Sequence, residues 1–233
     1  VTTPGGFGSQ VKSEFALAVR EAVRDVFRAE VPHYFKYVVA SGKETTQPKL
    51  EHLADEDTAH PRFVVSVPAA TGDWFGGWTG DVPCEGQRYA NADATSGRLV
   101  ELIQRGEPAV MLCHWPGLYN NGTRQGFEQL KSVILALDGR FRDQTIWMKI
   151  SELARYWAAR HLTRVHRVAD CVTLAAPLAC PHFTLRVPVA TVQTPPRLIQ
   201  QDRQIPLAEV RKPADLTTGT WLRQPDGVTV CFD

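Results

Sequence analysis

Two patterns of apolar residues alternate along the first two-thirds of the chain. In some stretches apolar residues recur every three or four positions, which is typical of amphipathic helices, and in others a short run is apolar throughout, which is typical of buried strands. The first pattern predicts helices over 9–29, 95–104, 127–137 and 151–158, and the second predicts strands over 34–40, 62–70, 109–113 and 145–148. Helices that alternate with buried strands predict an α/β architecture with a parallel sheet up to about residue 161.

The pattern changes after residue 161. Short β-rich runs follow one another, separated by Pro, Asp and Gly, and only 207–211 resembles a further helix. The runs lie at 163–168, 171–174, 183–189, 218–222 and 228–232. Residues 162–233 are therefore predicted to form a small antiparallel β module, and residues 1–161 a separate α/β domain.

Composition and charge narrow the function classes. The chain has 233 residues, 43% of them hydrophobic, and its 26 basic and 25 acidic side chains leave a net charge of +1. Such a balance provides no field to collect nucleic acid or an anionic membrane. No apolar run is long enough to cross a bilayer, residues 1–8 lack the charged-then-apolar order of a signal peptide, and the cysteines form no CxxC pair. These features predict a soluble, cytoplasmic chain that binds neither nucleic acid nor membrane.

The candidate chemistry lies in the loops that follow the predicted buried strands, because functional groups of parallel sheets gather at the carboxyl ends of the strands. His114 directly follows the strand predicted at 109–113, so its imidazole could move a proton near neutral pH. The alternative is a partly buried histidine that donates to a backbone carbonyl. Cys113 precedes His114 and should point to the opposite face, into the core, so no Cys-His dyad is predicted.

A loop rich in aromatic residues follows the strand predicted at 62–70. Trp74, Phe75 and Trp78 stand among glycines in a polar segment, and exposed rings of this kind suit stacking on the faces of sugar rings. Trp115, next to His114, offers another ring in a neighbouring loop. The alternative is that the rings of the first loop fold inward as a plug over the end of the sheet.

Three stretches in this order resemble the later motifs of polysaccharide deacetylases, the NodB-like superfamily. They are VTTPGGFG at 1–8, Gly72-Asp73-Trp74, and VMLCHWPGL at 110–118, the last being the most specific. The resemblance covers about residues 1–161 and implies a distorted (β/α) barrel. It also implies a hydrolase that removes acetyl groups from N-acetyl or O-acetyl sugars, using a divalent metal, usually zinc, to activate water.

The resemblance assigns roles to individual positions. His114 corresponds to a late histidine that acts as general acid toward the leaving amine. Asp73 and Trp74 correspond to an aspartate-tryptophan element of the catalytic site, in which the tryptophan helps to form the acetyl pocket. The remaining matches lie in a substrate-groove loop, at Thr3, Pro4 and Gly5.

Departures from the family pattern keep other functions open. The family's metal ligands, an aspartate and two histidines, lie in motifs that precede all of these, and the arginine of the first loop is absent. We therefore expect either the carboxyl-terminal part of a longer barrel, which would need its missing half or a second copy as partner, or a branch with altered chemistry. The alternatives to a carbohydrate deacetylase are a carbohydrate-binding or accessory domain without a metal site, and a purely structural segment.

Overall fold

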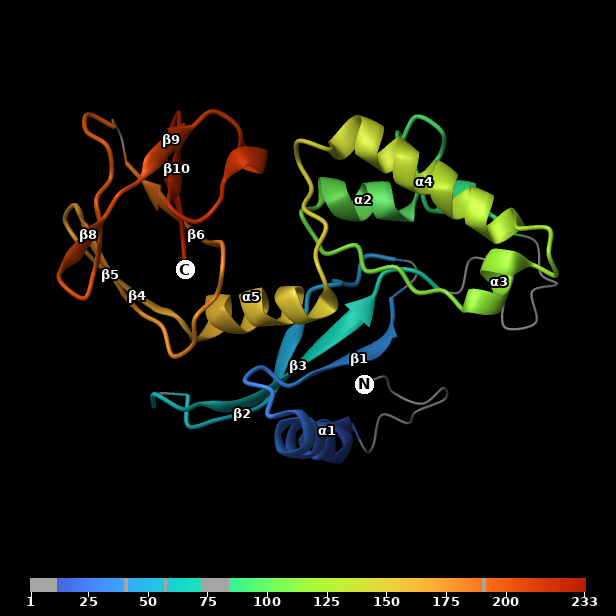
Figure 1. Cartoon of the computed structure of the whole chain (residues 1–233), viewed down its shortest axis with the longest axis horizontal. Helices are drawn as coiled ribbons and strands as arrows, with labels where there is room; N and C mark the ends of the chain where they lie inside the picture. The colour runs from blue at the N-terminus through green and yellow to red at the C-terminus, as the bar shows by residue number, and fades with distance from the viewer. Residues whose placement is uncertain (1–11, 40–41, 57, 73–83, 190–191) are drawn as a thin grey trace. The chain divides into compact units, whose positions relative to one another are not determined.

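The computed structural model describes residues 12–39, 42–56, 58–72, 84–189 and 192–233, which have mixed α/β structure. The chain divides into two compact units (Figure 1). Unit 1 comprises Val1–Arg142 and Met148–Trp157, and unit 2 comprises Asp143–Trp147 and Ala158–Asp233. The last boundary between the units, at Ala158, lies within helix α5 (Ile150–Leu162), whereas the sequence pattern changes at residue 161.

The sheet of unit 1 has three strands in the order β1-β3-β2. They are β1 (His33–Val38), β2 (Lys49–Ala54) and β3 (Arg62–Ala69). β3 lies in the middle and is buried from its second residue onward, which confirms the strands predicted at 34–40 and 62–70. β2 was not predicted, because its sequence KLEHLA is polar. Since β2 runs antiparallel to β3 and only β1 runs parallel to it, the expectation of a purely parallel sheet is wrong.

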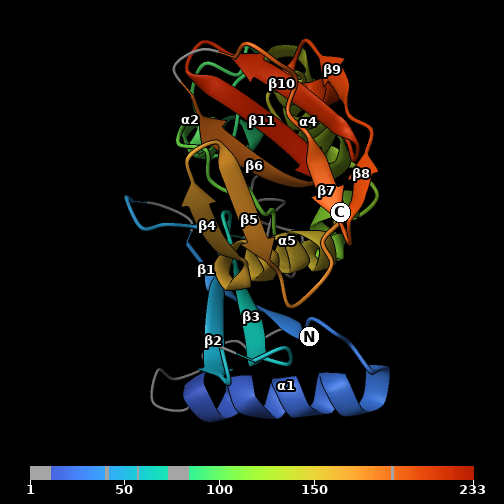
Figure 2. The same cartoon turned by 90° about the vertical axis from the view of Figure 1, so that its left-hand side faces the viewer.

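Helix α1 (Lys12–Phe27) packs on this sheet (Figure 2). Its buried residues Ala16, Val19 and Val23 form one apolar cluster with Tyr34 of β1 and Val64 of β3. The helical periodicity predicted this element correctly. The helix ends at Phe27, two residues earlier than predicted.

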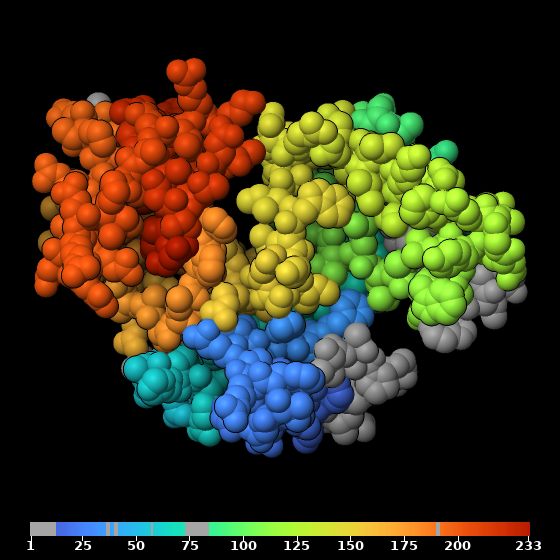
Figure 3. Space-filling view, viewed as in Figure 1, coloured from blue at the N-terminus to red at the C-terminus, as the bar shows by residue number. Residues whose placement is uncertain are grey.

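The rest of unit 1 is mainly helical. It contains η2 (Gly86–Arg88), α2 (Arg98–Gln104), α3 (Trp115–Tyr119) and α4 (Gln125–Phe141). Leu99 and Leu102 of α2 share a buried cluster with Val133, Leu137 and Phe141 of α4. The predicted helices at 95–104 and 127–137 are confirmed, and the space-filling view shows the yellow-green residues of α3 and α4 on the surface of this unit (Figure 3).

Two predicted strands are absent. Residues 109–113 and 145–148 are not strands, although both are apolar runs. Ile146 is 71% exposed and Trp147 is 59% exposed, so the second run is not even buried. An apolar run of four or five residues does not specify a strand unless a neighbouring strand pairs with it along its length.

Unit 2 is built from short strands, as the sequence predicts. A hairpin of β4 (Arg164–Val168) and β5 (Cys171–Ala175) precedes a sheet with the order β6-β11-β10-β9, and β7 pairs with β8. These strands are β6 (Phe183–Pro188), β7 (Leu198–Gln200), β8 (Arg203–Ile205), β9 (Ala208–Val210), β10 (Thr220–Gln224) and β11 (Gly227–Phe232), with η3 (Pro213–Asp215) before β10. Trp221, 1% exposed, packs with Val228 and Val230 in the core of the sheet.

Two details of unit 2 differ from the prediction. The segment 207–211, considered as a helix, contains strand β9, and β9 pairs parallel with β10 while the other pairs in the sheet are antiparallel. Across both units, none of the described helices is long and apolar enough to cross a membrane.

Candidate functional site

The segment that leads to His114 lies beside the end of β3. The amide of Ala70 donates to the carbonyl of Val110 over 2.7 Å, and the amide of Leu112 donates to the hydroxyl of Thr71 over 2.9 Å. The Thr71 hydroxyl donates in turn to the carbonyl of Leu112 over 3.3 Å, and its side chain is fully buried. The segment that follows β3 and the segment that precedes His114 therefore lie side by side at this point.

A second anchor holds the beginning of the same segment. The amide of Thr46 donates to a carboxylate oxygen of Glu107 over 2.7 Å, and the Thr46 hydroxyl donates to the carbonyl of Pro108 over 2.7 Å. Arg105 donates to the other oxygen of Glu107 over 2.5 Å. Burial raises the pKa of Glu107, but the hydrogen bonds from Thr46 and Arg105 outweigh it, so that the pKa lies below its ordinary value. The carboxylate is therefore charged at neutral pH and holds residues 107 and 108 against residue 46.

His114 stands at the start of α3. Its backbone is extended, with φ −90° and ψ 132°, and its carbonyl accepts from the amide of Gly117 over 3.2 Å in the first turn of the helix. Pro116 suits this first turn because its amide has no hydrogen to satisfy there. His114 is half-buried, so it lies at the boundary between protein and solvent.

Cys113 does not lie where the sequence predicted it. Its side chain is exposed rather than in the core. The prediction assumed a strand at 109–113 whose residues point alternately to two faces, and no such strand forms.

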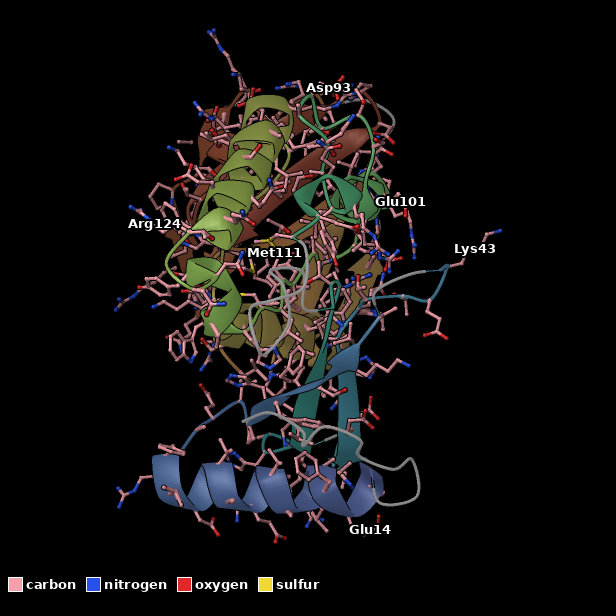
Figure 4. All side chains as sticks on the ribbon, turned by 90° about the vertical axis from the view of Figure 1, so that its right-hand side faces the viewer. Glu14, Lys43, Asp93, Glu101, Met111 and Arg124 are labelled. Carbon is pink, nitrogen blue, oxygen red and sulfur yellow. The ribbon has the colours of Figure 1, made fainter. Side chains whose placement is uncertain are left out.

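Helix α3 is closely packed on the start of α4. A Cβ atom built on Gly126 would lie 2.1 Å from the carbonyl oxygen of Gly117, so the contact requires glycine at position 126. The amide of Arg124 also donates to the carbonyl of Tyr119 over 2.8 Å. Figure 4 labels Arg124 at the start of α4 and Met111 in the segment between α2 and α3; Met111 packs against the cluster formed by α2 and α4. Contacts at Gly117 and Tyr119 therefore fix α3, which follows His114, against the start of α4.

Two aromatic side chains of α3 face solvent. Trp115 is 68% exposed and Tyr119 is 61% exposed, and their rings meet edge to face with centroids 6.2 Å apart. The sequence pointed to Trp115 and missed Tyr119, although the spacing of four residues in a helix would have placed both rings on one side. Large aromatic rings that are exposed to solvent are suited to contact with the flat face of a ligand.

The other residues predicted for the site cannot be placed. Asp73, Trp74, Trp78, Thr3, Pro4 and Gly5 lie outside the described residues. The sequence in turn missed Thr46, Thr71 and Glu107, which hold the segment before His114. Nothing in the local pattern distinguishes two buried threonines and a half-buried glutamate from ordinary loop residues.

The described residues do not supply the ligand set for a metal ion of the kind that the family resemblance implies. Within the described part of the chain, His, Cys, Asp and Glu side chains form no group of three or more that could hold an ion.

Comparisons with known proteins do not extend this description. Scanning the chain against protein-family models, the curated proteins and the solved structures gave no match in any of the three.

Proposed function

We propose that this chain forms part of a carbohydrate deacetylase-like hydrolase with a partial or distorted (β/α) barrel, in which His114 donates the proton to the leaving amine. One observation carries the proposal. The segment after β3, which continues through Gly72 toward Asp73, and the segment that ends at His114 are hydrogen-bonded side by side through Thr71 and Leu112. Thr71 directly precedes one of the stretches that carry the family resemblance, and Leu112 lies within the other.

The chemistry assigned to His114 is general acid catalysis. When water attacks the carbonyl of an N-acetyl group and the C–N bond breaks, acetate is released and the departing nitrogen must gain a proton. Histidine is the side chain that most often serves as a general acid, and the half-buried position of His114 leaves it accessible to a ligand. In the family a bound metal activates the attacking water; because the described residues do not supply its ligands, we assign no step of the reaction to a metal held by them.

The exposed rings of α3 support a sugar as the substrate. The apolar face of a pyranose stacks on aromatic side chains, and Trp115 and Tyr119 present such surfaces one residue and five residues after His114. The same rings also favour the second candidate, a carbohydrate-binding domain without catalysis, since stacking requires no metal.

The test measures acetate release from an N-acetylated oligosaccharide, chitotetraose, by the longest natural form of the protein that contains this chain. Replacing His114→Ala should lower turnover by about 100-fold or more, as expected for the loss of a general acid. The matched control is His166→Ala, since His166 is exposed on β4 in the other unit. Turnover in the His114 variant equal to that of the control would remove His114 from the mechanism.

Calorimetric titration with the same oligosaccharide separates the two candidates. Binding that is lost in Trp115→Ala without any acetate release in the parent protein would favour the carbohydrate-binding domain. Neither binding nor acetate release would contradict both.

A further inference from the structure

Unit 2 contains a cavity that the proposed function does not use. It has a volume of about 240 Å³ and lies between the end of α5, the loop after β5, and the paired ends of β6 and β11. Phe183 and Phe232 are opposite one another in the ladder of these two strands, and their rings meet edge to face at 5.7 Å between centroids. Leu178 and Cys180, both buried, add to an apolar wall.

The lining of the cavity also carries a few polar groups. They are the hydroxyl of Thr163, the side-chain amide of Gln200 and the carboxylate of Asp233. Within the described part of the chain, the first two make no side-chain hydrogen bond, so both can bond to a ligand. Asp233 is the only acidic or basic residue that lines the cavity.

The carboxylate of Asp233 is held by one of its two oxygens. Oδ1 accepts from the amide of His182 over 3.2 Å and from the hydroxyl of Thr218 over 2.5 Å. The amide of Thr218 donates to Nδ1 of His182, so this imidazole nitrogen carries no proton in that contact. Among the described residues Asp233 forms no ion pair, and its second oxygen takes part in no hydrogen bond. A negative charge without a basic partner therefore stands at the end of an apolar cavity.

The thiol of Cys231, near this carboxylate, is not ionised. Burial, with a contribution from the negative charge of Asp233, raises the pKa of Cys231 to about 11. Cys231 is therefore a neutral thiol at physiological pH, and Asp233 supplies the charged side chain in the lining of the cavity.

We propose that this cavity binds a small organic cation, whose apolar body contacts Phe183 and Phe232 and whose ammonium group meets Asp233. The volume is below the roughly 300 to 1,000 Å³ of sites for drug-sized ligands, so the ligand is a small amine rather than a sugar chain. The apolar wall selects a hydrocarbon body, and the carboxylate selects a positive charge over a hydroxyl group of the same size.

The experiment uses the whole chain with benzylammonium as the probe and benzyl alcohol as its uncharged counterpart. Backbone amide NMR spectra recorded during each titration give both the dissociation constant and the residues affected. We expect benzylammonium to shift the signals of Cys180, Phe183 and Phe232, with a dissociation constant in about the millimolar range because few atoms make contact.

Two variants and a control isolate the charge and the cavity. Asp233→Asn should weaken the binding of benzylammonium about five-fold, the size expected for a solvent-exposed charge pair, and leave the affinity for benzyl alcohol unchanged. Asp170→Asn makes the same charge change in the turn between β4 and β5 and should alter neither. Ala176→Phe, at an exposed position in the lining, should fill the cavity and abolish the binding of both probes.

Three results would overturn the proposal. They are equal affinity for the two probes, an unchanged affinity for benzylammonium in Asp233→Asn, and signal shifts that lie away from the cavity residues. Because these measurements concern unit 2 and use no acetylated sugar, their outcome is independent of the test of His114.

Discussion

Strand β3 and the segment from Glu107 to His114 both look like buried elements in the sequence, and they are held in different ways. β3 pairs on both sides, parallel with β1 and antiparallel with β2, and Val64, Val65 and Val67 are fully buried. The segment from Glu107 to His114 forms no strand. A backbone hydrogen bond, from Ala70 to Val110, and side-chain hydrogen bonds through Thr46, Thr71 and Glu107 hold it in place.

His114 is therefore positioned mainly by a few side chains and not by a strand ladder. A continuous ladder distributes its stability over many backbone pairs, so no polar side chain is indispensable to it. A segment held by a few side chains depends on each of them, because a buried group that loses its partner costs about 1–3 kcal/mol. We therefore expect the candidate site to be sensitive to substitutions that leave the sheet intact.

The largest effect is expected where the segment continues into α3. Gly126→Ala would place a methyl group on the carbonyl of Gly117 and should lower the free energy of unfolding by about 2–3 kcal/mol. Gly139→Ala, in the same helix with open space around it, should instead stabilise by up to about 1 kcal/mol. Urea unfolding of the two variants measures this, and equal effects would show that α3 does not depend on the contact.

A slightly smaller loss of unfolding free energy is expected from a substitution in strand β3. Val65→Ala removes two fully buried methyl groups and should lower the free energy of unfolding by about 2 kcal/mol. Val110→Ala, at a half-buried position beside Ala70, should cost less than about 1 kcal/mol. If urea unfolding shows the same loss of unfolding free energy in both variants, the segment around Val110 is packed as tightly as β3. That result would contradict the proposed difference between the two regions.

The anchor at Glu107 should produce a pH-dependent loss. At pH 7, Glu107→Gln should lower the free energy of unfolding by about 1–2 kcal/mol, because the amide replaces a charged acceptor of several hydrogen bonds. The pKa of Glu107 in the folded protein lies below its ordinary value of 4.5, so this stabilisation is present above that pH and is lost as the pH falls through the lowered pKa.

The matched control for this anchor is Glu21→Gln, on the exposed side of α1. Its difference from the parent protein should stay small at every pH. A difference for Glu107→Gln that grows below pH 4.5 in denaturant titrations would have the wrong sign and would contradict the assignment.

The smallest effect is expected at Thr71. Thr71→Val keeps the shape of the side chain and removes the hydroxyl that bonds to Leu112, at a cost of about 1 kcal/mol. Thr173→Val, on the exposed strand β5, should stay within about 0.5 kcal/mol of the parent protein. Comparing their denaturation midpoints checks this, and a neutral Thr71 variant would show that the hydroxyl does not hold the segment.

Much of the secondary structure could be predicted from the sequence. Helices α1, α2, α4 and α5 and strand β3 follow from apolar periodicity, because each buries one face or one run against a neighbour. The β-rich character of residues 162–233 follows from short runs separated by turn residues. These features depend mainly on patterns within each segment.

The remaining features depend on which segments become neighbours. The runs at 109–113 and 145–148 have the composition of buried strands, yet in the described residues neither pairs with a strand along its length, and the first only adjoins the end of β3. β2 has a polar sequence and becomes a strand because β3 offers it an edge. For the same reason Thr46 and Thr71 could not be recognised as anchors, since their partners are more than 40 residues away in the sequence.

Hydrogen exchange at the amide of Leu112 tests most directly whether side-chain anchors hold the segment before His114. In the parent protein this amide donates to the hydroxyl of Thr71 and should exchange slowly, and in Thr71→Val it should exchange much faster while the amide of Val65, bonded to the carbonyl of Pro32, is unchanged. Unchanged protection of Leu112 in the variant would show that the Thr71 hydroxyl does not hold this segment.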